Sequence, residues 1–457
     1  MPQRSPLSRL GAFFARTSTI VVVAFLVRLA LLYTLRGHGP YPISEVMSYG
    51  YETGRIAQAL AAGQGFSSPL HVPTGPTAWM TPLFPLLLSW IFRLTGIFSW
   101  TSYLVIGLVD CAFSALTVWP IQACARKAFG DGTATTAAWA WVFLPTAVHY
   151  AVNWVWDTAL VTLLFALVLL ATLYLRDTTR TAAWTGYGAL LGITALSNAS
   201  VVSTFPFLLG WAALKTRAHS RNWPRLAAAA VAAFVLVMSP WWIRNYSVFH
   251  RFIPFRSNLG LELWLGNNSR NPDILSGWLH PDQDPAEMRA MLRVGELAYM
   301  DAKQKEALAW IRSHPVDFLR NSFDRVCDTW IAFDEPMWEI MLLPGWLIWL
   351  NMMSVLFAVL TFSGALLAAR RASPFAVPFA VVILAFPLIY YVTHSSMRYR
   401  QPIEPEMTLL SSYALVALVS ALRPRHAESD PGFAVRPAPG EPALAGRPCA
   451  PRMEERP

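Results

Sequence analysis

Long uncharged apolar runs alternate with short polar segments along most of the chain. Several runs reach about 18 to 22 residues, which is the length that a helix needs to cross a hydrocarbon core of about 30 Å at about 1.5 Å per residue. The pattern therefore predicts an all-α polytopic membrane protein with about ten transmembrane helices. The expected spans are 17–35, 102–124, 133–151, 158–175, 183–197, 200–214, 226–243, 346–369, 374–394 and 405–422.

A segment rich in Pro and Gly, 37–101, separates the first two expected spans and contains two shorter helix-like stretches. The first, 44–62, begins with Ser44 as an N-cap and ends at Gly63. The second, 83–95, is apolar but too short to cross a membrane. We expect both to be juxtamembrane helices at the outer surface.

Composition and charge fix the expected orientation. Hydrophobic residues make up 55% of the chain and charged residues only 14%, whereas a soluble chain is about a quarter charged. The net charge of +9 does not indicate a nucleic-acid partner, because the Lys and Arg residues lie in short loops that the positive-inside rule assigns to the cytoplasm. The expected divisions are a cytoplasmic N-terminus at 1–16, an N-terminal transmembrane module at 17–243, an external loop domain at 244–345, C-terminal transmembrane helices at 346–422 and a disordered cytoplasmic tail at 423–457. Within the external loop domain, helices are expected near 286–312 and 315–331, separated at Pro315.

Metal and cofactor chemistry has no signal in the sequence. The four cysteines lack the spacing of a disulfide scaffold or a zinc site, and no His, Asp and Glu cluster demands a metal. We therefore expect no cofactor. Two charges lie inside expected spans, Arg28 and Asp110, each about 12 Å below the outer surface at about 1.5 Å per residue. Because an isolated charge in lipid is costly, they are expected either to pair or to be satisfied separately.

With the helices oriented in this way, unusual polar residues gather at the outer ends of the spans. Acidic groups beside arginines suit a reaction in which a base removes a proton while cations hold an anionic leaving group. We therefore predict an external active site at the boundary between lipid and water. Its candidates are Glu45, Glu52, Asp157, Arg244, Asn245, Arg398, Tyr399, Arg400 and Glu404.

Each of these residues also has a simpler interpretation. Glu45 and Glu52 are seven apart and would share one face of a helix, but they would also fit a solvated surface helix on which Arg55 pairs with Glu52. Asp157 follows two tryptophans and could mark the membrane interface. The arginines of 398–400 could be anchors, although positive charge is disfavoured in short external loops.

The order of motifs resembles the bacterial membrane glycosyltransferases of the GT-C superfamily, which are relatives of the protein O-mannosyltransferases and of the aminoarabinose transferase of lipid A. The likeness covers roughly residues 17–422. It rests on Glu52-Thr-Gly-Arg-Ile-Ala, Gly63-Gln-Gly-Phe66, Gly75-Pro-Thr-Ala-Trp79, Pro82-Leu-Phe-Pro85, Trp156-Asp157-Thr158, Arg244-Asn-Tyr246, Gly266-Asn-Asn268 and Arg398-Tyr-Arg400-Gln-Pro402.

The resemblance implies transfer of a sugar from a polyprenyl-phosphate carrier, with inversion, on the non-cytoplasmic face and without a metal. It implies an acidic residue of the first external loop as general base, for which Glu52 is the first match and Glu45 the second. Relatives often open this helix with an Asp-Glu pair, whereas this chain has Ser44 before Glu45. Asp157 matches a second acidic residue. The resemblance further suggests Arg244, Arg398 and Arg400 for the donor phosphate, and Trp79, Asn245, Asn267, His280 and Tyr399 for substrate contact.

The expected partners are a polyprenyl-phosphate-linked sugar, membrane lipid and an envelope glycan, lipid or protein acceptor, and the expected location is the bacterial inner membrane. Two other functions remain open. A flippase or transporter of lipid-linked sugars would place charges deep in several helices, and a non-catalytic envelope assembly subunit would not need acidic and basic groups to converge. Convergence of Glu52, Asp157 and the arginines would favour the transferase.

Overall fold

The computed structural model describes residues 15–36, 49–270, 277–331 and 345–422. Over these ranges the chain is helical, with one isolated β-bridge, Ser67 to Pro76, and no strand. The expected all-α polytopic class is confirmed, and the protein is an integral membrane protein. Six helices among the described residues are long and apolar enough to cross a membrane: Thr17–Arg36, Trp100–Phe129, Thr158–Leu175, Trp223–Phe249, Met352–Arg370 and Met397–Leu422.

The other expected spans correspond to shorter or interrupted helices, so the count of ten stays a prediction. The N-terminal half contains α2 (Thr17–Arg36), α4 (Glu52–Ala61), α5 (Leu83–Thr95), α6 (Trp100–Leu116), α7 (Val118–Phe129), α8 (Asp131–Phe143), α9 (Pro145–Val152), α10 (Thr158–Leu175), α11 (Thr181–Ser197), η1 (Ala199–Thr204) and α12 (Phe205–Arg217). The C-terminal half contains α13 (Trp223–Phe249), α14 (Leu259–Gly266), η2 (Gly277–Leu279), α15 (Pro285–Val294), α16 (Glu296–Ser313), α17 (Pro315–Ile331), α19 (Gly345–Arg370), α20 (Ala376–Ala385), α21 (Leu388–Val392), α22 (Met397–Arg400), η3 (Gln401–Ile403) and α23 (Glu404–Leu422).

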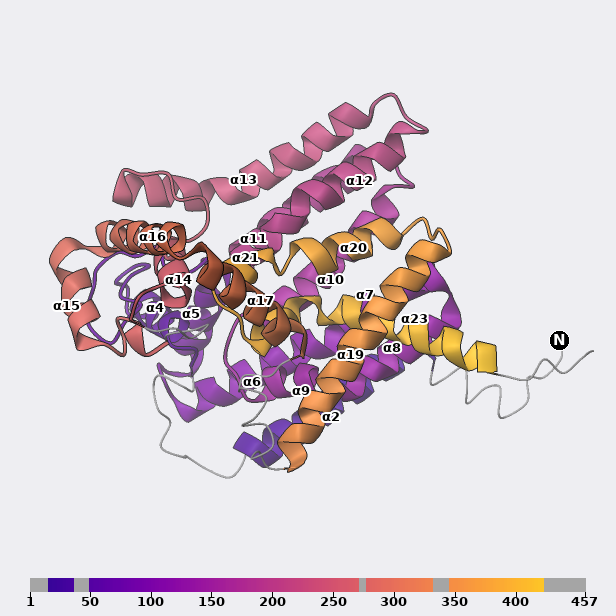
Figure 1. The fold of residues 1–457 in the computed structure, drawn as a ribbon, viewed down its shortest axis with the longest axis horizontal. Helices are drawn as coiled ribbons and strands as arrows, with labels where there is room; N and C mark the ends of the chain where they lie inside the picture. Colours follow the sequence, from indigo (N-terminus) through magenta and orange to yellow (C-terminus); the bar gives the residue numbers. More distant parts are fainter. Residues whose placement is uncertain (1–14, 37–48, 271–276, 332–344, 423–457) are drawn as a thin grey trace, which may run out of the picture.

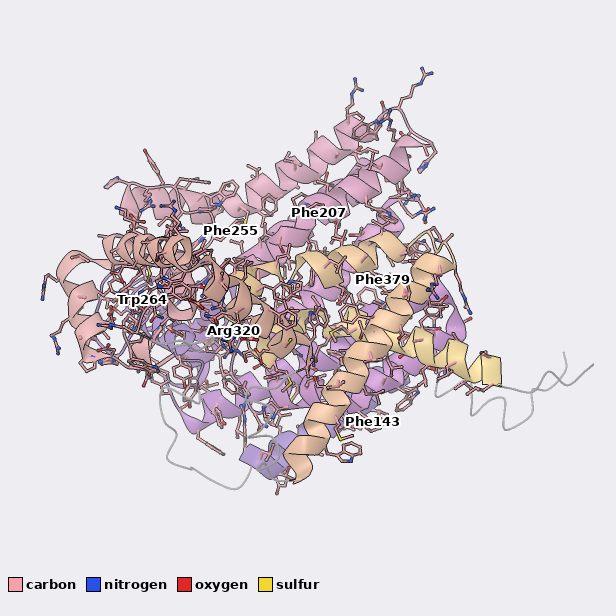
Figure 2. The ribbon with its side chains drawn as sticks, in the orientation of Figure 1. Phe143, Phe207, Phe255, Trp264, Arg320 and Phe379 are labelled. Atoms are coloured by element: carbon pink, nitrogen blue, oxygen red, sulfur yellow. The ribbon has the colours of Figure 1, made fainter. Side chains whose placement is uncertain are left out.

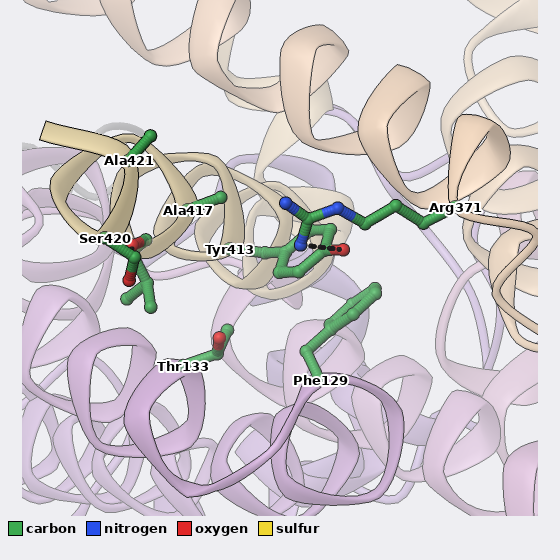
Figure 3. Close-up of a pocket in the computed structure, with 8 residues that line it drawn as sticks. Phe129, Thr133, Arg371, Tyr413, Ala417, Ser420 and Ala421 are labelled. Carbon is green, nitrogen blue, oxygen red and sulfur yellow. Dashed lines mark hydrogen bonds between the residues drawn. The ribbon is translucent and has the colours of Figure 1, made fainter. Parts of the chain in front are cut away.

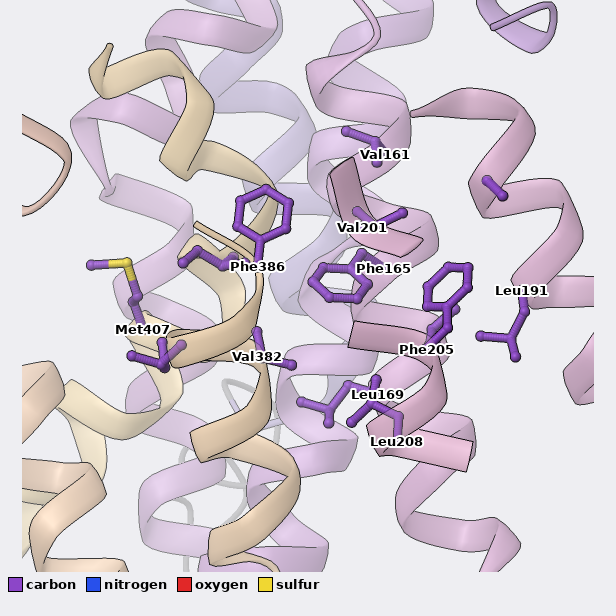
Figure 4. Packing of buried hydrophobic residues seen from close by; sticks show 14 of the residues in the cluster. Val161, Phe165, Leu169, Leu191, Val201, Phe205, Leu208, Val382, Phe386 and Met407 are labelled. Atoms are coloured by element: carbon purple, nitrogen blue, oxygen red, sulfur yellow. The ribbon is translucent and has the colours of Figure 1, made fainter. Parts of the chain in front are cut away.

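Helix α10 is the centre of the bundle. It is almost entirely apolar, and most of its residues are buried by other helices rather than left for lipid. Figure 4 shows Phe165 and Leu169 of α10 between Phe205 of α12 on one side and Val382 of α20 on the other. Asp157, which immediately precedes α10, therefore lies at the end of the most enclosed helix.

Small residues bring two of the peripheral helices close together. Gly188 and Gly192 of α11 form a G-x-x-x-G pair, and a Cβ at Gly188 would collide with the backbone of Ala230 in α13. Lipid tails are as apolar as the side chains, so close backbone packing of this kind is a main source of helix association in a membrane. The two helices accordingly run side by side (Figure 1).

Several helices that are not candidate spans collect at one end of the long axis. In Figure 1, α4, α5, α14, α15 and α16 lie together at the left, while the turn between α12 and α13 and the end of α23 lie at the right. Figure 2 shows the nitrogen atoms of basic side chains near that turn and, at the opposite end, around α15. The bundle thus has two polar ends.

Two expectations about local structure were wrong. The predicted helix 44–62 is not continuous, because Gly50 and Tyr51 both have positive φ, 78° and 47°, and α4 begins only at Glu52. Glu45 lies outside the described residues, so its predicted place on the same helical face as Glu52 stays a prediction. Farther along, the predicted helix 286–312 is split at Gly295, whose φ is 83°.

Of the two alternatives for Arg28 and Asp110, the ion pair is not observed. Arg28 is buried and donates to the Ser114 hydroxyl at 2.8 Å and to the carbonyls of Trp141 and Val142 at 3.1 and 3.4 Å. These carbonyls belong to the last turn of α8, where a cation satisfies unpaired acceptors. Arg28 thus bonds Ser114, one turn beyond Asp110 on α6, and carbonyls of α8 instead of Asp110.

Candidate active site

Glu52 is positioned by an unusual turn at the start of α4. A Cβ at Gly50 would lie closer than 3.0 Å to the carbonyl oxygen of Val155, so only glycine allows the two loops to approach this closely. The next residue, Tyr51, packs edge to face on Trp156 at 6.3 Å between ring centroids. Glu52 is thereby held beside the segment that leads to Asp157.

The Glu52 side chain is only 15% exposed, and its Oε1 lies 3.4 Å from Nε2 of His280. Burial raises the pKa of the Glu52 carboxyl, although the positive charges of His280 and Arg256 act against this. His280 in turn packs edge to face on buried Trp79. A raised pKa makes a carboxylate a stronger base, which suits the role of a general base.

The pair between Glu52 and Arg55 that the sequence allowed is replaced by other contacts. Arg55 lies 3.4 Å from Asp282, which also accepts hydrogen bonds from the backbone and ring nitrogens of His71 at 3.0 and 2.7 Å. Burial would raise the pKa of Asp282, but these hydrogen bonds and charges lower it overall. The segment 280–282 is thus tied to α4 at two points one helical turn apart.

Asp157 is 5% exposed, and its Oδ2 accepts a hydrogen bond from the Asn198 side chain at 2.9 Å. Burial raises the pKa of Asp157, while the Asn198 hydrogen bond and the charges of Arg256 and Arg398 oppose the rise. Asp157 is therefore a second enclosed carboxyl that experiences the same cation, Arg256, as Glu52.

Arg256 is the cation that links these groups. Its Nε donates to the carbonyl of Trp79 at 3.1 Å, and its terminal nitrogen lies 3.4 Å from Glu262. Glu262 is also bonded to His394 at 2.7 Å and to Asn258 at 2.6 Å. Burial alone would raise the pKa of Glu262, but the His394 hydrogen bond and the neighbouring charges lower it to about 2. The Arg256 side chain is 26% exposed, so it is not sealed off from ligands.

Arg398 lies on an aromatic surface formed by Trp154 and Trp156. Its guanidinium is 4.4 Å from the ring centroid of Trp156 and 5.4 Å from that of Trp154, an arrangement that stabilises the cation without neutralising it. The adjacent Tyr399 stacks on Tyr390 at 4.7 Å. Arg256 and Arg398 both act on Asp157, so they belong to one electrostatic cluster.

Arg244 and Asn245 have their polar groups occupied by backbone. Arg244 donates to the carbonyls of Thr77 at 2.6 Å and Phe66 at 2.7 Å, and it also contacts the Asn245 side chain. Asn245 is fully buried and donates to Ile253. These contacts fasten the segment 66–77 to the end of α13 and favour a structural role for both residues.

Arg400 and Asn267 likewise lie inside the protein rather than in the cluster. Arg400 is 1% exposed and donates to the carbonyls of Thr329 and Trp330, and it lies 3.4 Å from buried Glu404. Asn267 is fully buried. It donates to the carbonyls of Leu263 and Val392 and accepts from Arg325, which also donates to Gly266.

Comparisons with known proteins agree with the fold. Residues 81–243 match the family model described as dolichyl-phosphate-mannose-protein mannosyltransferase. The archaeal oligosaccharyltransferase AglB from Archaeoglobus fulgidus, in complex with an inhibitory peptide and a dolichol-phosphate, has a TM-score of 0.54 at 13% identity over 89% of this chain and 50% of that one. The chain thus spans about half the length of the oligosaccharyltransferase.

The fold is that of a GT-C membrane glycosyltransferase. The resemblance that the motifs indicated is confirmed at this level. ArnT from Cupriavidus metallidurans bound to undecaprenyl phosphate also matches, at 14% identity over 91% of this chain and 79% of that one, with a TM-score of 0.37. No curated protein sequence matches the chain.

Arg256, Glu262 and His394 were missed at the sequence level. Within this GT-C fold they come from the loop after α13, from α14 and from the loop after α21. The available signal was weak: Arg256 and Glu262 are six residues apart in a loop that was predicted to be external, where positive charge is disfavoured. Among the described residues, no group of three or more His, Cys, Asp and Glu side chains is arranged to hold a metal.

Proposed function

We propose that the protein is a glycosyltransferase that moves a sugar from a polyprenyl-phosphate carrier to a hydroxyl of an envelope glycan, lipid or protein. We place the reaction at the periplasmic face of a bacterial inner membrane. The observation that carries this proposal is the position of Glu52, an enclosed carboxylate 3.4 Å from His280, which packs on Trp79, the residue whose carbonyl accepts from the partly exposed Arg256. The match to the mannosyltransferase family model supports the same reaction class.

In the proposed reaction Glu52 accepts the proton of the acceptor hydroxyl while the hydroxyl oxygen attacks the anomeric carbon. The bond from that carbon to the phosphate oxygen breaks as the new glycosidic bond forms, so the configuration inverts. The carrier phosphate leaves with the electron pair, and Arg256 and Arg398 stabilise its charge. In this proposal the Asp157 carboxylate orients the two cations, because it interacts electrostatically with both.

Glu52→Gln tests this assignment. The amide keeps the shape of the side chain but cannot accept the proton, and general-base catalysis is worth about 10² to 10⁴ in rate, or about 3 to 5 kcal/mol. The assay is transfer of labelled sugar from a panel of polyprenyl-phosphate sugars to an envelope fraction of a deletion strain, whose glycan mass spectra identify the acceptor.

The matched control is Glu306→Gln, because Glu306 is an exposed external glutamate on α16. It should transfer at the wild-type rate. A transfer rate of Glu52→Gln within threefold of the wild-type rate would show that Glu52 is not the general base.

A further inference from the structure

A cavity lies at the end of the bundle opposite the candidate active site. It has a volume of about 370 Å³ and is bordered by the end of α7, the start of α8, the residue after α19 and the last turns of α23. Figure 3 shows Arg371 reaching into it from the right, with Thr133 and Phe129 below and Ala417 on α23 at the upper left. No residue of the candidate active site lines it.

The charged group of this cavity is Arg371. Its guanidinium donates to the Tyr413 hydroxyl at 3.3 Å and lies 5.7 Å from the Tyr413 ring centroid. Tyr413 is fixed by stacking on Phe129 at 4.1 Å. No Asp or Glu lines the cavity, and no ion pair of the described residues includes Arg371. The cavity therefore contains a positive charge that Tyr413 keeps in place, and no acidic side chain of the lining neutralises it.

The walls combine small residues, hydroxyl groups and nearby lipid-facing side chains. Ala417 and Ala421 leave the space open, and Thr133 and Ser420 contribute hydroxyl groups. On the same turns of α23, large apolar side chains such as Leu418 are exposed, as expected of a surface that contacts acyl chains. An occupant must accordingly carry a negative head and an apolar tail.

We propose that this cavity binds the headgroup of an anionic phospholipid from the surrounding leaflet. The phosphate contacts the Arg371 guanidinium and the hydroxyl groups, and the acyl chains follow the exposed face of α23. Basic pockets between transmembrane helices at the cytoplasmic side commonly bind such headgroups, and the basic loops assign this end of the bundle to the cytoplasm. The site is independent of the proposed transferase reaction.

Lipid binding to the purified full-length protein in detergent tests the proposal. Native mass spectrometry counts the lipids retained during titration with phosphatidylglycerol or with phosphatidylcholine of the same acyl chains. Wild type should retain phosphatidylglycerol selectively. Arg371→Gln should weaken this binding about five- to tenfold, in line with the loss of one basic contact. The neighbouring Arg370→Gln, which removes an exposed charge outside the cavity, should change it less than twofold.

A second variant, Ala417→Phe, fills the cavity while Arg371 keeps its charge, and it should lower phosphatidylglycerol binding to the same degree. Equal effects of Arg371→Gln and Arg370→Gln would overturn the proposal in favour of general attraction to the basic end. Undiminished binding to Ala417→Phe would overturn it as well. Displacement of the lipid by millimolar glycerol 3-phosphate would identify a soluble phosphate ligand and would also contradict a lipid site.

Discussion

Gly50→Ala probes the contact that places Glu52 beside the Asp157 segment. Gly50 has a φ of 78°, and a Cβ there would lie closer than 3.0 Å to the Val155 carbonyl oxygen. An L-residue in this left-handed conformation costs roughly 1–2 kcal/mol, and overpacking adds about 1–3 kcal/mol. We therefore expect a loss of about 2–5 kcal/mol of stability.

Gly63 provides the matched control. It has the same φ of 78°, but no atom lies within 4 Å of the position a Cβ would take. Gly63→Ala should therefore lose only the conformational part, roughly 1–2 kcal/mol. The difference between the two variants isolates the contact between the Gly50 turn and the Val155 carbonyl.

The measurements are the apparent Tm at one scan rate and the rate of sugar transfer. Relief of the collision moves the Gly50 turn by up to roughly 1 Å, and a misplacement of this size can reduce catalysis about 10²-fold. Gly50→Ala should thus lose both stability and rate, whereas Gly63→Ala keeps its rate. Equal Tm and equal rate in the two variants would refute the structural role assigned to Gly50.

Three further outcomes are expected. Arg256→Gln should lower the rate about 10²- to 10³-fold at nearly unchanged Tm. Arg244→Gln should mainly lower Tm, because two loop carbonyls lose their hydrogen-bond donor. A loss of Tm in the first variant and a loss of rate in the second would exchange the roles of the two arginines. Burial raises the pKa of Glu52, and the charge of Arg256 lowers it. Because the proposed base acts in its ionised form, the rate should fall as the pH drops through the pKa of Glu52. Arg256→Gln removes the charge that lowers this pKa, so the fall in rate should move to higher pH. An unmoved pH–rate profile would argue against that charge effect. Arg325→Ala should lower the free energy of unfolding by about 2–4 kcal/mol, because several buried acceptors lose their hydrogen-bond donor. Arg320 is exposed on the same helix, so Arg320→Ala should have the Tm of wild type.

Much of the fold could be predicted from apolar run length and from breaker residues. Helix α5 has the predicted bounds, 83–95, and α17 begins at Pro315 as expected. The errors occurred where one glycine with positive φ interrupts a helical pattern, as at Gly50 and Gly295. A glycine inside such a pattern is compatible with either a helix or a turn, and the packed neighbour that decides between them, Val155 in the case of Gly50, is distant in sequence.

The candidate site was harder to predict because sequence spacing does not give direction. Arg398 and Arg400 are two residues apart on α22, so their side chains point about 200° apart around the helix axis. Arg398 consequently lies on Trp156, whereas Arg400 is buried against other carbonyls. Arg256 has no charged neighbour that would mark it as part of a motif, and its position became evident only from its contacts with Trp79 and Glu262.

The attachment of 280–282 to α4 also has a consequence for biosynthesis. Glu52 emerges early from the ribosome, but its neighbour His280 and the cation Arg398 come much later. At about 5–20 residues per second, roughly 20 to 70 seconds separate the synthesis of Glu52 from that of Arg398. Until Arg398 has been made, the nascent chain carries the proposed base without the complete pair of proposed leaving-group cations, Arg256 and Arg398, so the proposed sugar transfer can begin only after the last helices have been inserted.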